Sequence, residues 1–172
     1  MLFRKLLTNW IVPIISGLVL AFVIYNYLFF IVVVPSESMR STIDINDRLI
    51  VTRNCEDLSR QNVMVFRMQT PNGEQLLIKR LIGLPGDSVK IVNGETYVNK
   101  KKIEESYINN PDNKSFFGNG VEIPADNYLF LGDNRSYSYD GRYWQNPFIS
   151  EDDIVGKAVC IIYPFNRFRI FD

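Results

Sequence analysis

The chain has 172 residues, and its 19 basic side chains balance its 19 acidic ones. Because no basic tract is longer than Lys100-Lys101-Lys102, the sequence lacks the charge pattern of a nucleic-acid-binding protein, and we expect no nucleic-acid partner. Histidine is absent, which excludes a Ser-His-Asp triad or a histidine-ligated metal within the chain, and we expect no metal or other cofactor.

An uncharged, mostly apolar segment runs from Trp10 to Val34. It exceeds the roughly 20 residues that a helix needs to cross the hydrocarbon core of a bilayer, and it predicts a transmembrane helix over residues 10–31. The helix should stop before Val32, because a β-branched run leads there into Pro35, which disfavours helix in the residue before it.

The charges around this segment predict its orientation. Arg4 and Lys5 precede it, and the next charge, Glu37, follows it. By the positive-inside rule we expect residues 1–9 in the cytoplasm and residues 32–172 outside it, in a single-pass protein of the plasma membrane.

A cleavable signal peptide is the alternative interpretation of the same segment. Ser36 and Ser38 imitate the small-x-small pattern of a cleavage site. The apolar core of a signal peptide spans roughly 7–15 residues, however, and this segment is well beyond that, which favours an uncleaved anchor.

Beyond Pro35, short apolar runs separated by turn residues predict a mostly antiparallel β domain. The candidate strands are Arg48–Thr52, Asn62–Met68, Gln75–Ile82, Val89–Val92, Glu95–Asn99, Tyr128–Leu131 and Gly156–Tyr163. Asn93-Gly94 is typical of a type I′ hairpin, in which both central residues have positive φ. The polar stretch from Glu104 to Val121 is predicted to be a loop, and a small inserted subdomain is expected at about residues 88–127.

A serine nucleophile in a chain without histidine needs another proton acceptor, and Lys79 is the candidate. Burial disfavours an ammonium group and can lower a lysine pKa by about 3–5 units. In the strand pattern, Leu77 and Leu81 share the face of Lys79, whereas Arg80 points the other way. On pattern alone, an edge-strand lysine with an exposed amine is the alternative.

Three blocks after the apolar segment resemble, in order, the catalytic blocks of the type I signal peptidases. They are PSESM at Pro35–Met39, KRLIGLPGD at Lys79–Asp87 and GDNRSYSYDGR at Gly132–Arg142. The run IVGKA at Ile154–Ala158 resembles the closing strand of the same family. Three ordered blocks behind one anchor make chance agreement improbable, and they imply a signal-peptidase-like catalytic domain of antiparallel β-sheet.

The resemblance implies that Ser38 is the nucleophile and Lys79 the general base of a Ser-Lys dyad. It also implies that the backbone N–H of Ser38 and the hydroxyl of Ser36 bind the oxyanion, and that Ser138 hydrogen-bonds the Lys79 amine. The implied function is that of a membrane-bound serine endopeptidase that cleaves N-terminal signal peptides from secreted preproteins. Those preproteins and the lipid bilayer would be its partners.

Two further sets of residues follow from motif position. A pocket for small substrate side chains is implied at Val32, Val34, Met39, Ile43 and Ile78. Plain core packing is the alternative for each of them. A structural ion-pair cluster behind the site is expected from Arg80, Asp133, Arg135, Asp140 and Arg142. Solvated loop charges contributing roughly 0–1 kcal/mol each are the alternative there.

The chain departs from the family pattern at Ser41, where a proline is usual, and at Ser136-Tyr137, where Asp-Asn is common. The first change is expected to loosen the segment behind the nucleophile.

Three other classes of protein are alternatives to the peptidase. A penicillin-binding-type enzyme needs S-x-x-K, which no serine here provides. A self-cleaving repressor needs a DNA-binding region in place of the anchor. The non-enzymatic alternative is a membrane-tethered β domain that binds extracellular partners.

Overall fold

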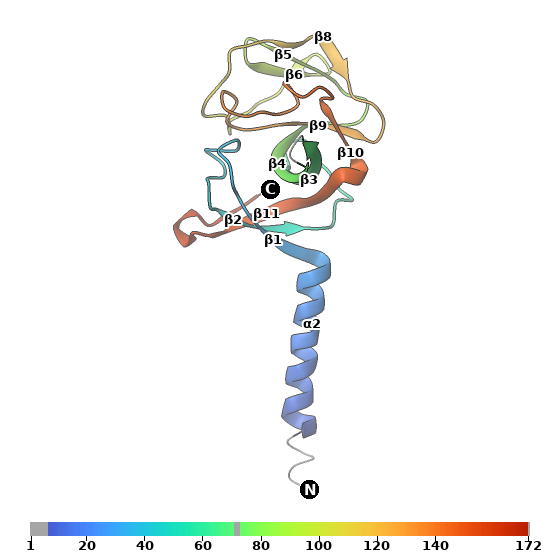
Figure 1. Ribbon diagram of the computed structural model, residues 1–172, viewed down its shortest axis with the longest axis vertical. Coiled ribbons are helices and arrows are strands. Elements are labelled where there is room, and N and C mark those ends of the chain that lie inside the picture. The colour runs from blue at the N-terminus through green and yellow to red at the C-terminus, as the bar shows by residue number, and fades with distance from the viewer. Residues whose placement is uncertain (1–6, 71–72, 172) are drawn as a thin grey trace.

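A computed structural model describes residues 7–70 and 73–171 of the chain. An apolar helix projects from a β domain that contains two sheets, the larger beside the helix and the smaller at the far end (Figure 1). The predicted fold class, mostly antiparallel β with one N-terminal helix, is confirmed.

The N-terminal segment begins with a π-helical turn, η1 (Leu7–Ile11), and continues as α2 (Val12–Leu28). Within it, Thr8–Tyr25 is long and apolar enough to cross a membrane, judged by length and composition, and none of this stretch is buried in the protein. Arg4 and Lys5, on which the predicted orientation rests, lie outside the described residues.

The helix ends earlier than the predicted boundary at residue 31. Leu28 is its last residue, and Phe29 already pairs with Thr52 of the neighbouring strand. Pairing with that strand continues to Val33, so the aromatic and β-branched run is extended over its whole length.

The larger sheet has eight strands in the order β1-β2-β11-β3-β4-β9-β10, with β12 paired to β11. The strands are β1 (Phe29–Val33), β2 (Arg48–Thr52), β3 (Val63–Thr70), β4 (Gly73–Gly83), β9 (Asn127–Leu131), β10 (Phe148–Ser150), β11 (Ile154–Tyr163) and β12 (Arg169–Ile170). Single 3₁₀ turns, η2 (Glu151–Asp153) and η3 (Phe165–Arg167), flank β11. Strand β4 therefore lies inside the sheet, between β3 and β9.

The smaller sheet is inserted between β4 and β9. Its order is β7 (Lys101–Lys102), β6 (Glu95–Val98), β5 (Ser88–Val92) and β8 (Phe116–Glu122). Asn93 and Gly94 join β5 to β6 with φ values of 50° and 83°, so the predicted hairpin is confirmed.

Strand β8 falls mostly within the stretch that was predicted to be a loop, so that prediction is wrong for residues 116–121. Phe117, Gly118 and Gly120 have positive φ, and the register between β5 and β8 shifts. Phe116 pairs with Ile91 and Val121 with Val89, so residues 117–120 form a wide bulge between two paired parts of β8.

The two faces of β4 contribute to different apolar clusters. Ile78 packs with Val34, Met39 and Ile43. Leu77 and Leu81 join Met64, Phe66 and Phe130, as period-two alternation requires. Lys79 pairs with Met64 of β3 and so lies on this second face.

Candidate active site

Ser38 and Lys79 meet although 41 residues separate them in sequence. Ser38 lies in the turn that follows β1, and the Lys79 Nζ is 2.6 Å from its Oγ. Lys79 is 3% exposed, and β4 has partner strands on both sides. The interpretation of Lys79 as an exposed edge-strand lysine is therefore wrong.

Burial is the main influence on the protonation of Lys79. Loss of hydration disfavours the ammonium and lowers the pKa of Lys79 from 10.5 to about 8. The carboxylates of Asp140 and Asp133 act in the opposite direction on this pKa, and Arg142 reinforces the lowering. A pKa near 8 leaves a fraction of the amine neutral at pH 7, which suits a general base.

The two further serines have different surroundings. The Ser36 Oγ is exposed and lies 3.3 Å from the Ser38 Oγ. Ser138 is 3% exposed, and its hydroxyl has no hydrogen-bond partner among the residues that the structure describes. The predicted hydrogen bond from Ser138 to the Lys79 amine is thus not formed. A Cβ at Gly132 would collide with both the Ser138 hydroxyl and the Ser38 carbonyl, so Ser138 lies close to the Ser38 backbone.

The turn that carries Ser38 is held by Asn134 and Thr42, which the motifs did not predict as site residues. The backbone N–H of Asn134 donates to the Ser38 carbonyl at 3.0 Å, and its side chain donates to the Glu37 carbonyl at 3.0 Å. The Thr42 hydroxyl donates to Asp133. Asn134 follows Asp133 within the third block, so its place in that motif was the available signal.

The five charges predicted to cluster behind the site are all buried. Arg80 binds Asp133 through two nitrogens at 2.8 and 2.6 Å, and Arg142 binds Asp140 at 2.8 and 2.9 Å. Solvated loop charges are therefore the wrong description.

Arg135, the fifth of these charges, binds a carboxylate that does not belong to the predicted set. It pairs with Glu105, from the segment that joins the strands of the smaller sheet. Sequence reasoning missed Glu105 because it lies in a polar stretch with no periodicity.

The implied pocket residues gather in one apolar cluster. Val34, Met39, Ile43 and Ile78 are at most 7% exposed, and Val32 packs against them half-buried. Met39 and Ile78 are sequence neighbours of Ser38 and Lys79, but Ile78 lies on the opposite face of β4 from Lys79.

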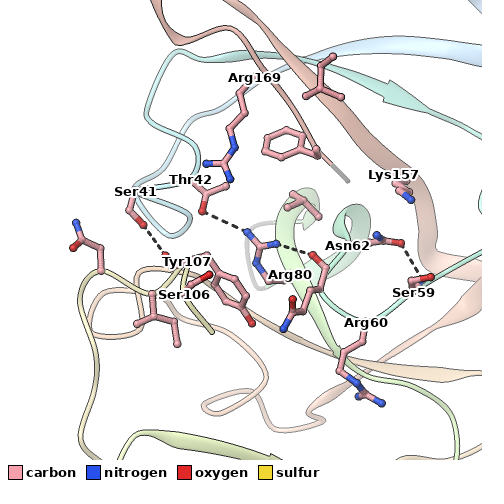
Figure 2. Close-up of a pocket in the computed structure, with 16 residues that line it drawn as sticks. Ser41, Thr42, Ser59, Arg60, Asn62, Arg80, Ser106, Tyr107, Lys157 and Arg169 are labelled. Atoms are coloured by element: carbon pink, nitrogen blue, oxygen red, sulfur yellow. Dashed lines mark hydrogen bonds between the residues drawn. The ribbon is translucent and has the colours of Figure 1, made fainter. Parts of the chain in front are cut away.

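Ser41 is tied to the smaller-sheet insertion, contrary to the expected loosening. Its φ is 91°, which the ring of a proline forbids, and its hydroxyl donates to the Tyr107 carbonyl at 3.0 Å (Figure 2). The Tyr107 ring in turn lies 3.9 Å from the Arg80 guanidinium. Serine at this position therefore joins the turn that carries Ser38 to the charged cluster.

Cavity size does not locate the chemistry. A cavity of about 690 Å³ is lined by Thr42, Arg80 and Tyr107, with neither Ser38 nor Lys79 in its wall (Figure 2). A smaller cavity of about 380 Å³ borders Glu37 and Arg40, on either side of Ser38 in sequence.

Taken together, a hydroxyl in contact with a buried amine is an arrangement suited to nucleophilic hydrolysis. Comparison with known proteins agrees with that class. The model of the family described as "Signal peptidase, peptidase S26" matches residues 7–163. The chain therefore belongs to the signal peptidase S26 family and is a serine peptidase.

Individual relatives give the same result. A signal peptidase I of Leptolyngbya laminosa is 38% identical over 144 residues, which cover 78% of this chain and 68% of the relative. One of Bacillus amyloliquefaciens is 34% identical over 96% of this chain and 93% of its own length. A crystal structure of a signal peptidase I from Enterococcus faecalis V583 has a TM-score of 0.51 and 27% identity, and covers 60% of this chain and 98% of that one.

Proposed function

We propose that the chain is a membrane-bound serine endopeptidase that cleaves N-terminal signal peptides from secreted preproteins with a Ser38–Lys79 dyad. The observation that carries the proposal is the 2.6 Å contact between the Lys79 Nζ and the Ser38 Oγ. Membership of the signal peptidase family supports signal-peptide cleavage as the reaction. The substrates are signal-peptide-bearing preproteins.

Acylation begins with Lys79 neutral. The Ser38 hydroxyl donates its hydrogen bond to the Lys79 Nζ, and the Oγ attacks the scissile carbonyl as its proton passes to the amine. The resulting ammonium gives that proton to the leaving amine of the mature protein. The signal peptide remains bound to the Ser38 Oγ as an ester.

Hydrolysis repeats the same proton transfers with water. Lys79, neutral again, takes a proton from a water molecule that attacks the ester carbonyl. Collapse of the tetrahedral intermediate returns the proton to the Ser38 Oγ and releases the carboxylate end of the signal peptide.

Ser36 is proposed to stabilise the oxyanion together with the backbone N–H of Ser38. Its hydroxyl is exposed beside the Ser38 Oγ, where a substrate carbonyl would arrive. Loss of one such donor typically lowers kcat by about 100–1,000-fold.

Ser138 is proposed as an orienting residue. A buried hydroxyl without a partner is unfavourable by about 1–3 kcal/mol, and a hydrogen bond to the Lys79 amine during turnover would relieve this.

The apolar cluster of Val32, Val34, Met39, Ile43 and Ile78 is proposed as the pocket for the residues before the cut. These side chains leave little free volume around them, since four of the five are buried. Only small substrate side chains would fit beside them.

The proposed membrane arrangement is a single pass with the catalytic domain outside the cytoplasm. One exposed apolar helix precedes the β domain, and the basic residues Arg4 and Lys5 precede that helix. The positive-inside rule then places the N-terminus in the cytoplasm of a plasma-membrane protein.

A cleavage assay tests the proposal on the full chain in detergent. Wild type should cut a preprotein after a small residue, and Ser38→Ala and Lys79→Ala should each abolish the cut while circular dichroism stays unchanged. Lys101→Ala, an exposed lysine of β7, is the matched control and should keep wild-type activity. Cleavage at the wild-type rate by either dyad variant would contradict the mechanism.

A further inference from the structure

The 380 Å³ cavity beside the nucleophile turn is polar and rich in amide groups. Its wall includes Asn109, Asn110 and Asn134, together with Arg40, Ser41 and Tyr137. The Asn110 and Asn134 amides bind each other within the wall, whereas Asn109 is exposed. An asparagine side chain both donates and accepts hydrogen bonds, so Asn109 matches the N–H and C=O groups of an extended polypeptide. The Tyr137 side chain, 73% exposed, adds a flat surface at the wall.

This cavity shares its backbone with the nucleophile. Asn134 binds the carbonyls of both Glu37 and Ser38 at 3.0 Å, and Glu37 itself lines the cavity. Val34 and Met39, by contrast, pack into the apolar cluster. The reacting serine therefore lies where an apolar region meets a polar one.

The walls of the cavity are fixed by hydrogen bonds between distant segments. The Ser41 hydroxyl donates to the Tyr107 carbonyl at 3.0 Å, and the Ser136 N–H donates to the Asn110 carbonyl at 3.2 Å. The Asn110 amide also donates to the Asn134 side chain at 3.1 Å. A surface held in this way loses little further freedom when it binds a chain.

We propose that this cavity binds the first residues of the mature segment, those that follow the cut, through their main-chain groups. The inference rests on the proposed signal-peptide cleavage and names the second half of its substrate site. A preprotein changes at the cut from a segment chosen for small apolar residues to a mature sequence of any composition. Recognition of main-chain groups suits the second half, because it does not depend on side chains.

Two peptides with the same signal portion test the proposal on the full chain in detergent, one ending two residues after the cut and the other six. Wild type should cleave the longer peptide with about tenfold higher kcat/KM, as expected for one or two added hydrogen bonds. Asn109→Ala and Tyr137→Ala should each bring this ratio close to one. Asn113→Ala, an exposed asparagine outside the cavity wall, should keep the wild-type ratio.

The possible outcomes separate the two proposals. Equal cleavage of both peptides by wild type, or an unchanged ratio in Asn109→Ala, would overturn the mature-segment site while leaving signal-peptide cleavage intact. Cleavage of neither peptide by wild type would overturn the proposed function, and the mature-segment site with it.

Discussion

Lys79 and Arg80 are neighbours on β4, yet their cationic groups have opposite surroundings. Lys79 points to the face of Met64 and contacts a serine hydroxyl, and it has no salt bridge among the residues that the structure describes. Arg80 points to the other face and binds Asp133 twice, with the Tyr107 ring against it. Burial of a lysine without a paired carboxylate lowers its pKa and suits it to proton transfer. A buried cation that is bound to a carboxylate instead holds segments of the chain together.

Removing the Lys79 charge should produce the largest effects, a loss of cleavage and a gain in stability. Lys79→Met should abolish cleavage, a loss of at least about 10,000-fold in kcat/KM, comparable to removal of a catalytic base in other serine peptidases. The same variant should be more stable than wild type at pH 7. A pKa near 8 in place of 10.5 corresponds to about 3 kcal/mol of unfavourable burial.

The sign of that stability gain follows from proton linkage. The unfolded chain binds the lysine proton more tightly than the folded one, so wild-type stability rises with pH between about 8 and 10.5. Thermal unfolding should therefore show the Lys79→Met advantage in full below pH 8 and lose it above pH 10.5. A variant that is less stable than wild type at pH 7 would contradict the account.

Removing the Arg80 charge should have the opposite consequence for stability. Arg80→Met leaves the fully buried Asp133 without its cation, which should lower the free energy of unfolding by about 3–5 kcal/mol. Chemical denaturation measures this loss. Arg40→Met, which breaks an exposed pair with Glu37, is the control and should change stability by less than about 1 kcal/mol.

The pH dependence of cleavage tests the Lys79 side of the comparison, because burial lowers the pKa of Lys79 to about 8. Since Lys79 must lose its proton, kcat/KM should rise about tenfold per pH unit and level off near pH 8. A rate that is flat from pH 5 to 8 would exclude Lys79 as the base.

Substitutions at Ser41 should have the smallest effect on stability, since Ser41 is linked to Arg80 only through Tyr107. Ser41→Gly keeps access to positive φ and loses the hydrogen bond, whereas Ser41→Ala loses the bond and keeps the strain of about 1–2 kcal/mol. Glycine should therefore be the more stable of the two in thermal unfolding, and proline the least stable. Equal stability of glycine and proline would argue against the positive φ.

The sequence motifs predicted that Ser38 and Lys79 act together, because each block carries its residue at a fixed place, and the structure brings the two side chains into contact. Their catalytic roles stay a proposal. Alternation along β4 was enough to assign Lys79 and Arg80 to opposite faces. Glu105 and Tyr107 could not be predicted in this way, since they reach the site from an insertion with no periodic pattern.

Two local features were also outside the reach of the sequence. The end of α2 was misplaced because pairing between β1 and β2 decides it, and that pairing depends on a strand far along the chain. Strand β8 was missed because Gly118 and Gly120 resemble turn residues, and they lie in a bulge between residues that pair with β5.

The direct passage from α2 into β1 has one more consequence. Phe29 to Val33 are paired residue by residue with β2, so a paired strand and no flexible linker joins α2 to the turn region that holds Ser38. Five strand residues at about 3.3 Å each give a spacer of about 17 Å. In the proposed membrane arrangement, the length of this strand fixes the distance between the membrane and Ser38. That distance sets how many residues separate the cut from the apolar segment of the preprotein.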